Sequence, residues 1–143
     1  MRSFLVALFF VLVSTSPAFA GLPAGDFNFD DKIDAVDIDL LSAVVRSGQY
    51  SILYDLNFDL VVDDRDREIW VHDIVGTFFG DANLDGEFNT SDLILTFQIG
   101  EYEDDVPLNS GWASGDWNGD GDFNTSDFIL AFQDGGFEAG PRK

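Results

Sequence analysis

The chain has 143 residues, no cysteine, and a formal net charge of −20 from 27 acidic and seven basic side chains. So acidic a chain is excluded as a partner of nucleic acid or of anionic membranes, and without cysteine it forms neither disulfides nor thiolate metal sites. Aromatic residues make up 15% of the chain, which argues against disorder. The composition therefore favours a folded protein that binds cations.

The first twenty residues have the three-part layout of a secretory signal peptide. Arg2 precedes an apolar run over residues 4–13, and a small-x-small sequence ends at Ala20. The alternative is a membrane anchor, but the apolar run is too short to span a bilayer. We therefore expect cleavage after Ala20, secretion to the extracellular space or cell surface, and no membrane span afterwards. The mature chain then keeps six basic and all 27 acidic side chains, a net charge of −21.

Four acidic segments of twelve residues dominate the rest of the chain: loop 1 (26–37), loop 2 (55–66), loop 3 (81–92) and loop 4 (116–127). Each has Asp at positions 1, 5 and 12, Asn at position 3, an apolar residue at position 8, and Asp or Asn at position 9. Residues 80–98 and 115–133 are identical at fourteen of nineteen aligned positions. Like charges at this density cost free energy unless a cation lies between them.

The spacing is that of a calcium-binding loop. Calcium takes about 6–8 oxygen ligands, which a loop supplies from the side chains at positions 1, 3, 5, 9 and 12 and the carbonyl at position 7. The apolar residue at position 8 points away from the ion, where it can pair with its counterpart in a partner loop. We predict two to four Ca²⁺ ions. The candidate ligands are Asp26, Asn28, Asp30, Lys32, Asp34 and Asp37; Asp55, Asn57, Asp59, Val61, Asp63 and Asp66; Asp81, Asn83, Asp85, Glu87, Asn89 and Asp92; and Asp116, Asn118, Asp120, Asp122, Asn124 and Asp127.

Loops 1 and 2 are less regular than loops 3 and 4. Position 6 turns sharply and favours Gly, but it is Asp31 in loop 1 and Leu60 in loop 2. A left-handed backbone at a non-Gly residue costs about 1–2 kcal/mol. Both loops carry an extra acid at position 9, Asp34 and Asp63, which adds negative charge. The alternative for one Asp-rich segment is a solvated Asx-turn, and four copies in the same register argue against it.

A short apolar helix is expected to open at position 12 of each loop. Apolar residues follow at helical spacing, and we expect helices to end at Gly48, Gly80, Gly100 and Gly135. The segments before loops 1, 2 and 4 have no helical pattern. The sequence therefore predicts a small all-α protein of loop-then-helix units. The predicted helical apolar residues are Ile38, Leu41, Val44 and Val45; Ile69, Ile74, Val75, Phe78 and Phe79; Leu93, Ile94 and Phe97; and Phe128, Ile129 and Phe132.

Over residues 26–136, the paired units with Asp at position 12 resemble dockerin type I repeats, the calcium-dependent docking modules of secreted bacterial polysaccharide-degrading systems. The resemblance implies two tandem pairs, residues 21–79 and 80–140, each with two calcium ions and a small core between antiparallel helices. It also implies a cohesin-like protein partner. The hydroxyl pairs at positions 10 and 11 are candidate partner-binding residues: Thr90, Ser91, Thr125 and Ser126. The alternative is plain helix-start chemistry, with Asn89 and Asn124 as caps.

Two other interpretations stay open. The helices after loops 3 and 4 lack the basic residue usual in dockerin recognition helices, which motivates a calcium-stabilised structural protein without a cohesin partner. The absence of an enzyme domain motivates the same structural interpretation. A further interpretation is that the chain is a fragment or decayed remnant of a larger secreted enzyme. We expect no enzyme activity, because no nucleophile–base pair is present. The single histidine, His72, is expected on an exposed helix face. The three tryptophans are expected to pack in a small core, and sugar binding by their rings is the less favoured alternative.

Overall fold

The computed structural model describes residues 24–143, so the predicted signal peptide lies outside the described residues. The described chain is small and helical, which confirms the predicted all-α class. Helices α1 (Ala35–Ser47), α2 (Asp64–Ile69), α3 (Thr90–Ile99) and α4 (Thr125–Asp134) each follow one acidic loop. A π-helical segment, η1 (Trp70–Val75), continues α2, and a 3₁₀ turn, η2 (Trp112–Ser114), precedes loop 4. None of the helices in this described part is long and apolar enough to cross a bilayer.

The same capping arrangement begins all four helices. The residue at loop position 9 is the N-cap, and its side chain accepts a hydrogen bond from the backbone two residues on. The Asp at position 12 completes a capping box, because its carboxylate accepts from the N-cap backbone. Each helix therefore begins at position 10, two residues before the predicted start. The expected start at position 12 was wrong because Asp and Asn at position 9 are strong N-caps, and the interpretation of Asn89 and Asn124 as caps is confirmed. The caps are Asp34, Asp63, Asn89 and Asn124.

Three of the four predicted helix ends are confirmed. Gly48, Gly100 and Gly135 cap α1, α3 and α4 in the left-handed conformation. The predicted end at Gly80 is wrong. The helical path after loop 2 ends at Gly76, which has φ 77° and donates its N–H to the carbonyl of Val71. Gly76 is the first residue after α2 that adopts this conformation without steric cost.

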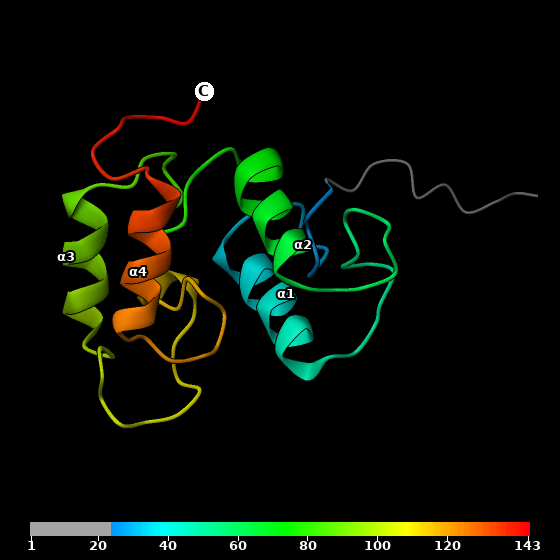
Figure 1. The fold of residues 1–143 in the computed structure, drawn as a ribbon, viewed down its shortest axis with the longest axis horizontal. Helices are drawn as coiled ribbons and strands as arrows, with labels where there is room; N and C mark the ends of the chain where they lie inside the picture. Colours follow the sequence, from blue (N-terminus) through cyan, green and yellow to red (C-terminus); the bar gives the residue numbers. More distant parts are fainter. Residues whose placement is uncertain (1–23) are drawn as a thin grey trace, which may run out of the picture.

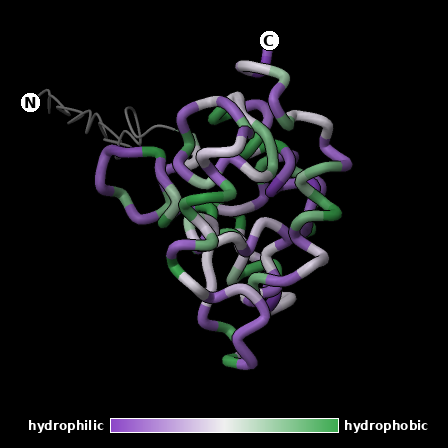
Figure 2. Tube along the Cα trace, turned by 90° about the vertical axis from the view of Figure 1, so that its left-hand side faces the viewer, coloured by the Kyte–Doolittle hydropathy of each residue, from purple (hydrophilic) through white to green (hydrophobic). Residues whose placement is uncertain are grey.

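The helices form two adjacent antiparallel pairs, α1 with α2 and α3 with α4 (Figure 1). Across α3 and α4, the rings of Phe97 and Phe128 stack with centroids 5.7 Å apart. The three tryptophans are fully buried, which confirms the core interpretation for them. Trp112 lies 6.5 Å from Trp70 and 5.8 Å from Phe79, ring to ring, so one apolar core runs through both halves. Hydrophobic and hydrophilic residues alternate along the trace, and hydrophobic residues also lie at the tips of peripheral loops (Figure 2).

Loops 3 and 4 are closed by an exchange of short segments. The carbonyl of Phe88 in loop 3 accepts from the N–H of Glu138, after α4, at 2.8 Å. The carbonyl of Phe123 in loop 4 accepts from the N–H of Glu103, after α3, at 2.9 Å. We expected the position-8 residues of loops 3 and 4 to pair with each other. Each pairs instead with a residue that follows the helix of the other loop. Because Glu103 and Glu138 are separated by the same spacing as the two loops, the repeat extends beyond the matched residues 80–98 and 115–133.

Because the core is shared, we predict that truncation of the Trp112 side chain destabilises the whole described chain. Trp112→Ala should lower the free energy of unfolding by about 3–5 kcal/mol, because it leaves a cavity between the halves. Ile52→Ala is the control, since Ile52 is 73% exposed, and it should change stability by less than about 0.5 kcal/mol. Urea unfolding followed by fluorescence and circular dichroism measures both. Two separate transitions in the parent protein would contradict the shared core.

Candidate functional site

All four acidic loops fold around the carboxylate at position 1. In each loop this carboxylate accepts the backbone N–H of position 6, at 2.9, 3.0, 2.8 and 2.8 Å in chain order. The Asn at position 3 accepts the N–H of position 5, and the Asp at position 5 accepts the N–H of position 7. Four segments with different sequences between these positions thus have the same turn structure.

The carboxylate at position 12 closes each loop onto its helix. One oxygen accepts a backbone N–H from the start of the loop, at 2.7 Å in loops 1 and 2, 3.0 Å in loop 3 and 2.9 Å in loop 4. The other oxygen accepts the N–H of position 9 at 2.8–2.9 Å in every loop. Position 12 therefore ties together the beginning and the end of its loop. These carboxylates are Asp37, Asp66, Asp92 and Asp127.

Positions 4 and 6 both have a left-handed backbone in all four loops. Loop 4 has Gly at both positions, loop 3 has Leu84 and Gly86, and loops 1 and 2 have no Gly at either. The sequence predicted the cost at position 6 but missed position 4, where two phenylalanines also have positive φ. Loops 1 and 2 therefore bear this strain at two positions each, loop 3 bears it at one, and loop 4 is free of it. The non-Gly residues concerned are Phe29, Asp31, Phe58, Leu60 and Leu84.

Burial separates the predicted Asp ligands at positions 1 and 12 from those at position 5. The Asp residues at positions 1 and 12 are buried in every loop, and those at position 5 are exposed in every loop. Burial raises the pKa of Asp116 to about 7, with the neighbouring Asp127 carboxylate adding to the rise. Burial also raises the pKa of Asp127 to about 6, and it raises the pKa of Asp81 and Asp92. Negative charge in loops 3 and 4 is therefore held at a free-energy cost that a cation would offset.

The chemistry of the predicted donors suits a hard cation. Carboxylates, Asn amide oxygens and a backbone carbonyl are the oxygen donors that Ca²⁺ takes. Within residues 24–143, however, no three or more Asp, Glu or His side chains come together closely enough to form a metal-binding group. The loop carboxylates accept backbone N–H groups of their own loop instead. The structure thus gathers each predicted ligand set into one loop without converging its carboxylates on one point.

The position-7 residues were predicted to contribute only their carbonyls. Their backbone N–H groups donate to the Asp at position 5, which fixes the turn that precedes the carbonyl. This arrangement is independent of side-chain type, since the four residues include a base, an apolar residue and two acids. They are Lys32, Val61, Glu87 and Asp122.

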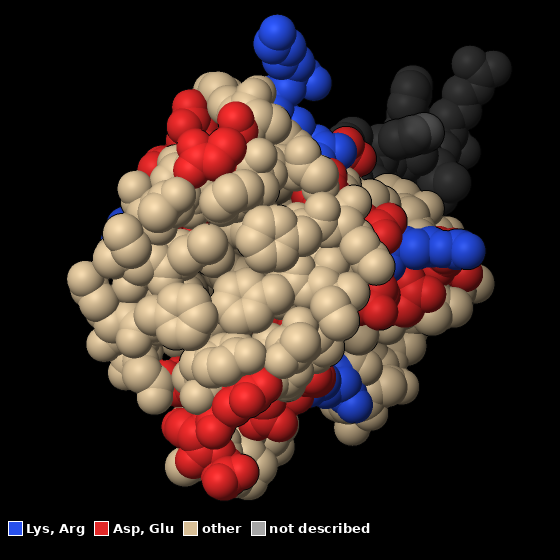
Figure 3. Space-filling view, turned by 60° about the vertical axis from the view of Figure 1, so that its left-hand side comes forward, with Lys and Arg blue, Asp and Glu red and all other residues tan. Residues whose placement is uncertain are grey.

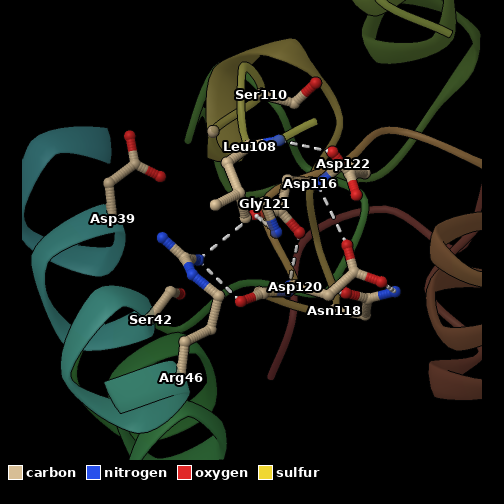
Figure 4. Close-up of polar contacts among 12 residues, drawn as sticks. Asp39, Ser42, Arg46, Leu108, Ser110, Asp116, Asn118, Asp120, Gly121 and Asp122 are labelled. Atoms are coloured by element: carbon tan, nitrogen blue, oxygen red, sulfur yellow. Dashed lines mark hydrogen bonds and ion pairs between the residues drawn. The ribbon is translucent and has the colours of Figure 1, made fainter. Parts of the chain in front are cut away.

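Loop 4 also receives two arginines from the first half of the chain, of which Arg46 is labelled in Figure 4. The Arg46 guanidinium, from α1, lies 3.7 Å from the Asp116 carboxylate and donates to the carbonyl of Gly119 at 2.7 Å. Arg67, from α2, donates to the carbonyls of Trp117 and Asn118, both at 2.6 Å. Sequence reasoning missed both residues, because neither belongs to a repeated position.

The candidate partner-binding hydroxyls lie at exposed helix starts. Thr90 Oγ1 donates to Glu138 at 2.8 Å, and Thr125 Oγ1 donates to Glu103 at 2.9 Å. Ser126 Oγ donates to Asn124 at 2.7 Å, and the backbone N–H of Ser91 donates to Asn89. These contacts, together with the Asn caps, favour the helix-start interpretation of the hydroxyl pairs.

His72 is not on an exposed face, contrary to our expectation. Its Nε2 lies 3.0 Å from an Asp134 carboxylate oxygen, and its ring packs edge-on against Phe79 at 5.4 Å. Asp134 also accepts the backbone N–H of Phe79. His72 therefore links η1 to the end of α4. The helical pattern placed it on the outer side because it could not show that α4 packs there.

One face of the molecule carries apolar side chains without charge. Six apolar side chains on the outer sides of α3 and α4 are exposed by about half of their surface. A shallow hollow of about 370 Å³ lies over α4. Figure 3 shows this face as a broad uncharged field with acidic side chains at its edges. We call it the α3–α4 face. Its exposed apolar residues are Ile94, Leu95, Phe97, Ile99, Ile129 and Phe132.

Comparison of the chain with models of protein families, with curated proteins and with solved structures finds no significant match. The resemblance to dockerin repeats therefore rests on the loop residues alone.

The left-handed position 6 of loop 2 predicts a stabilising substitution. Leu60 has φ 72° and is 73% exposed, so Leu60→Gly should raise the free energy of unfolding by about 0.5–1 kcal/mol after the entropy cost of glycine. Val61→Gly is the matched control, and it should lower stability by roughly 0.5–1 kcal/mol because Val61 has no strain to release. Urea denaturation of both variants measures the difference. A loss of stability in Leu60→Gly would show that the loop bears no strain at that position.

Proposed function

We propose that this protein is a secreted calcium-binding docking module, built of two tandem dockerin-like pairs, that attaches to a cohesin-like protein in an extracellular polysaccharide-degrading or cell-surface system. The observation that carries the proposal is the single hydrogen-bonding scheme of the four acidic loops. In each loop the carboxylates at positions 1 and 12 are buried, the carboxylate at position 5 is exposed, and the other predicted ligand atoms are oxygens. A bound calcium ion would supply positive charge that offsets the cost of gathering these carboxylates.

In this proposal the chain's own residues do most of the positioning. The backbone N–H groups of positions 5, 6 and 7 donate to the Asn amide oxygen at position 3 and to the carboxylates at positions 1 and 5, which orients these side chains within each loop. The capping box fixes position 12 at the start of the following helix. Ca²⁺, when bound, adds charge neutralisation at these carboxylates. Extracellular calcium modules bind in roughly the 10⁻⁴–10⁻³ M range, and we expect affinities of that order here.

The α3–α4 face supports the docking half of the proposal. A contiguous apolar surface on a soluble protein marks an interaction site more often than scattered apolar residues do. Its acidic edges favour a partner with an apolar centre and a basic rim. Because the Thr90 and Thr125 hydroxyls already bond to Glu138 and Glu103, we assign partner contact mainly to apolar residues.

Calcium binding is tested by calorimetric titration of residues 21–143, with circular dichroism alongside. We expect two to four ions per chain and a gain in helix. Asp120→Ala removes an exposed position-5 ligand from loop 4 and should reduce the count by one ion. Asp73→Ala is the control, because Asp73 is also exposed but lies outside the loops, and it should leave the count unchanged. No binding in millimolar calcium, or an unchanged count in Asp120→Ala, would contradict the proposal.

Docking is tested with immobilised cohesin-like domains in millimolar calcium. We expect capture of the parent protein and its loss when calcium is chelated. Ile129→Glu places a charge on the α3–α4 face, where Ile129 is 53% exposed, and should abolish capture. Ile52→Glu makes the same change far from this face and should not. If no cohesin-like domain captures the parent protein while calcium still binds, the structural alternative is favoured.

A further inference from the structure

Loops 3 and 4 have the same predicted side-chain ligands but different surroundings. The position-1 carboxylate of loop 3, Asp81, accepts a hydrogen bond from the neutral hydroxyl of Thr77. The position-1 carboxylate of loop 4, Asp116, faces the positive guanidinium of Arg46 at 3.7 Å. Residues 80–141 contain no Lys or Arg. The positive charge beside loop 4 therefore comes from the first half of the chain.

Arg67, in α2, binds backbone carbonyls of loop 4. Its side chain is 2% exposed, and it makes three hydrogen bonds to groups outside its own helix. Two go to the carbonyls of Trp117 and Asn118, and Nε donates to Ser42 Oγ at 3.0 Å. Trp117 and Asn118 stand at loop positions 2 and 3, and the predicted carbonyl ligand is at position 7. Arg67 thus holds the loop backbone without occupying a predicted carbonyl ligand.

Gly119 shows how closely Arg67 approaches the loop. A Cβ at Gly119 would lie 2.6 Å from the Arg67 guanidinium carbon. Position 4 of the other loops holds Phe or Leu with positive φ, so the left-handed backbone alone does not demand glycine there. The glycine in loop 4 leaves room for the arginine. Gly119 and the buried Arg67 side chain are therefore packed directly against each other.

We infer that Arg46 and Arg67 are positioning residues for calcium at loop 4, and that through them the first half of the chain sets the affinity of loop 4 independently of loop 3. This inference rests on the proposed calcium binding. Arg46 contributes charge, since its guanidinium offsets the Asp116 carboxylate in the metal-free loop and repels an incoming cation. Arg67 contributes geometry, since it keeps the backbone of positions 2 and 3 in place before the ion arrives. The two effects on affinity are opposite in sign.

The chain contains its own reporters for the test. The N–H of Gly86 donates to Asp81, and the N–H of Gly121 donates to Asp116, both at 2.8 Å. These two amides occupy position 6 of loops 3 and 4, where a bound ion changes the charge on the acceptor. A ¹⁵N-edited NMR calcium titration of residues 21–143 therefore follows the two loops separately in one sample. The Gly86 midpoint is the internal control for the Gly121 midpoint.

Arg46→Gln should lower the calcium midpoint of Gly121 about two- to fivefold, the range expected for a partly exposed charge pair. Arg46→Lys keeps the charge and should leave the midpoint near that of the parent. Arg67→Lys keeps the charge but loses the two-pronged hold on the loop, and should raise the Gly121 midpoint by roughly three- to tenfold. Faster amide hydrogen exchange in metal-free loop 4 should accompany Arg67→Lys. The Gly86 midpoint should stay within about twofold in all three variants.

Arg46 decides the outcome if Arg67→Lys fails to fold, because the Arg46 side chain is 34% exposed and its replacement disturbs no core packing. An unchanged Gly121 midpoint in Arg46→Gln, or equal shifts of the Gly86 and Gly121 midpoints, overturns the inference while leaving calcium binding in place. Absence of any calcium-dependent shift at both amides in the parent protein overturns the proposed function and the inference with it.

Discussion

The fold depends on buried carboxylates that satisfy the backbone of their own loops. At positions 1 and 12 of each acidic loop, an Asp side chain accepts N–H groups that would otherwise lack partners in a tight turn. This arrangement explains how a chain with a net charge of −20 can be compact with so few basic residues. It also explains why each helix begins where it does, because the position-12 carboxylate belongs both to the loop and to the capping box. The helices are short, and their apolar sides gain stability by packing on a core rich in aromatic rings.

The two halves of the chain differ in what they contribute. Loops 1 and 2 bear the left-handed strain at non-Gly residues, while loop 4 has glycine at both positions. The first half in turn provides the arginines that reach loop 4, and Trp70 joins Trp112 in the common core. The irregular loops and the regular loops are therefore parts of one packed structure. Arg67 could be buried only because loop 4 offers carbonyls and nearby carboxylates to receive its charge.

Sequence patterns predicted the helices, three of the four helix ends and the position of every acidic loop. They succeeded because loop register, helical spacing and capping are local properties that a few residues determine. They failed where distant segments meet. Nothing in the residues around His72 indicates that Asp134 packs against it, and Gly76 could not be distinguished from Gly80 without the π-helical turn. Arg46 and Arg67 read as ordinary helix-surface residues until loop 4 is placed beside them. Position 8 was misjudged because its partner lies after the opposite helix.

The exchange of segments between loops 3 and 4 has a consequence for the order of assembly during synthesis. The carbonyl of Phe88 pairs with Glu138, fifty residues later in the chain, whereas Phe123 pairs with Glu103, which precedes it. A chain that emerges from its N-terminal end therefore has the partner of loop 4 ready before loop 4 itself appears. Loop 3 is made earlier but is completed last, when residues 137–138 arrive. If a protease removed the chain from residue 137 onward, loop 3, in the middle of the sequence, would accordingly lose the hydrogen bond that closes it.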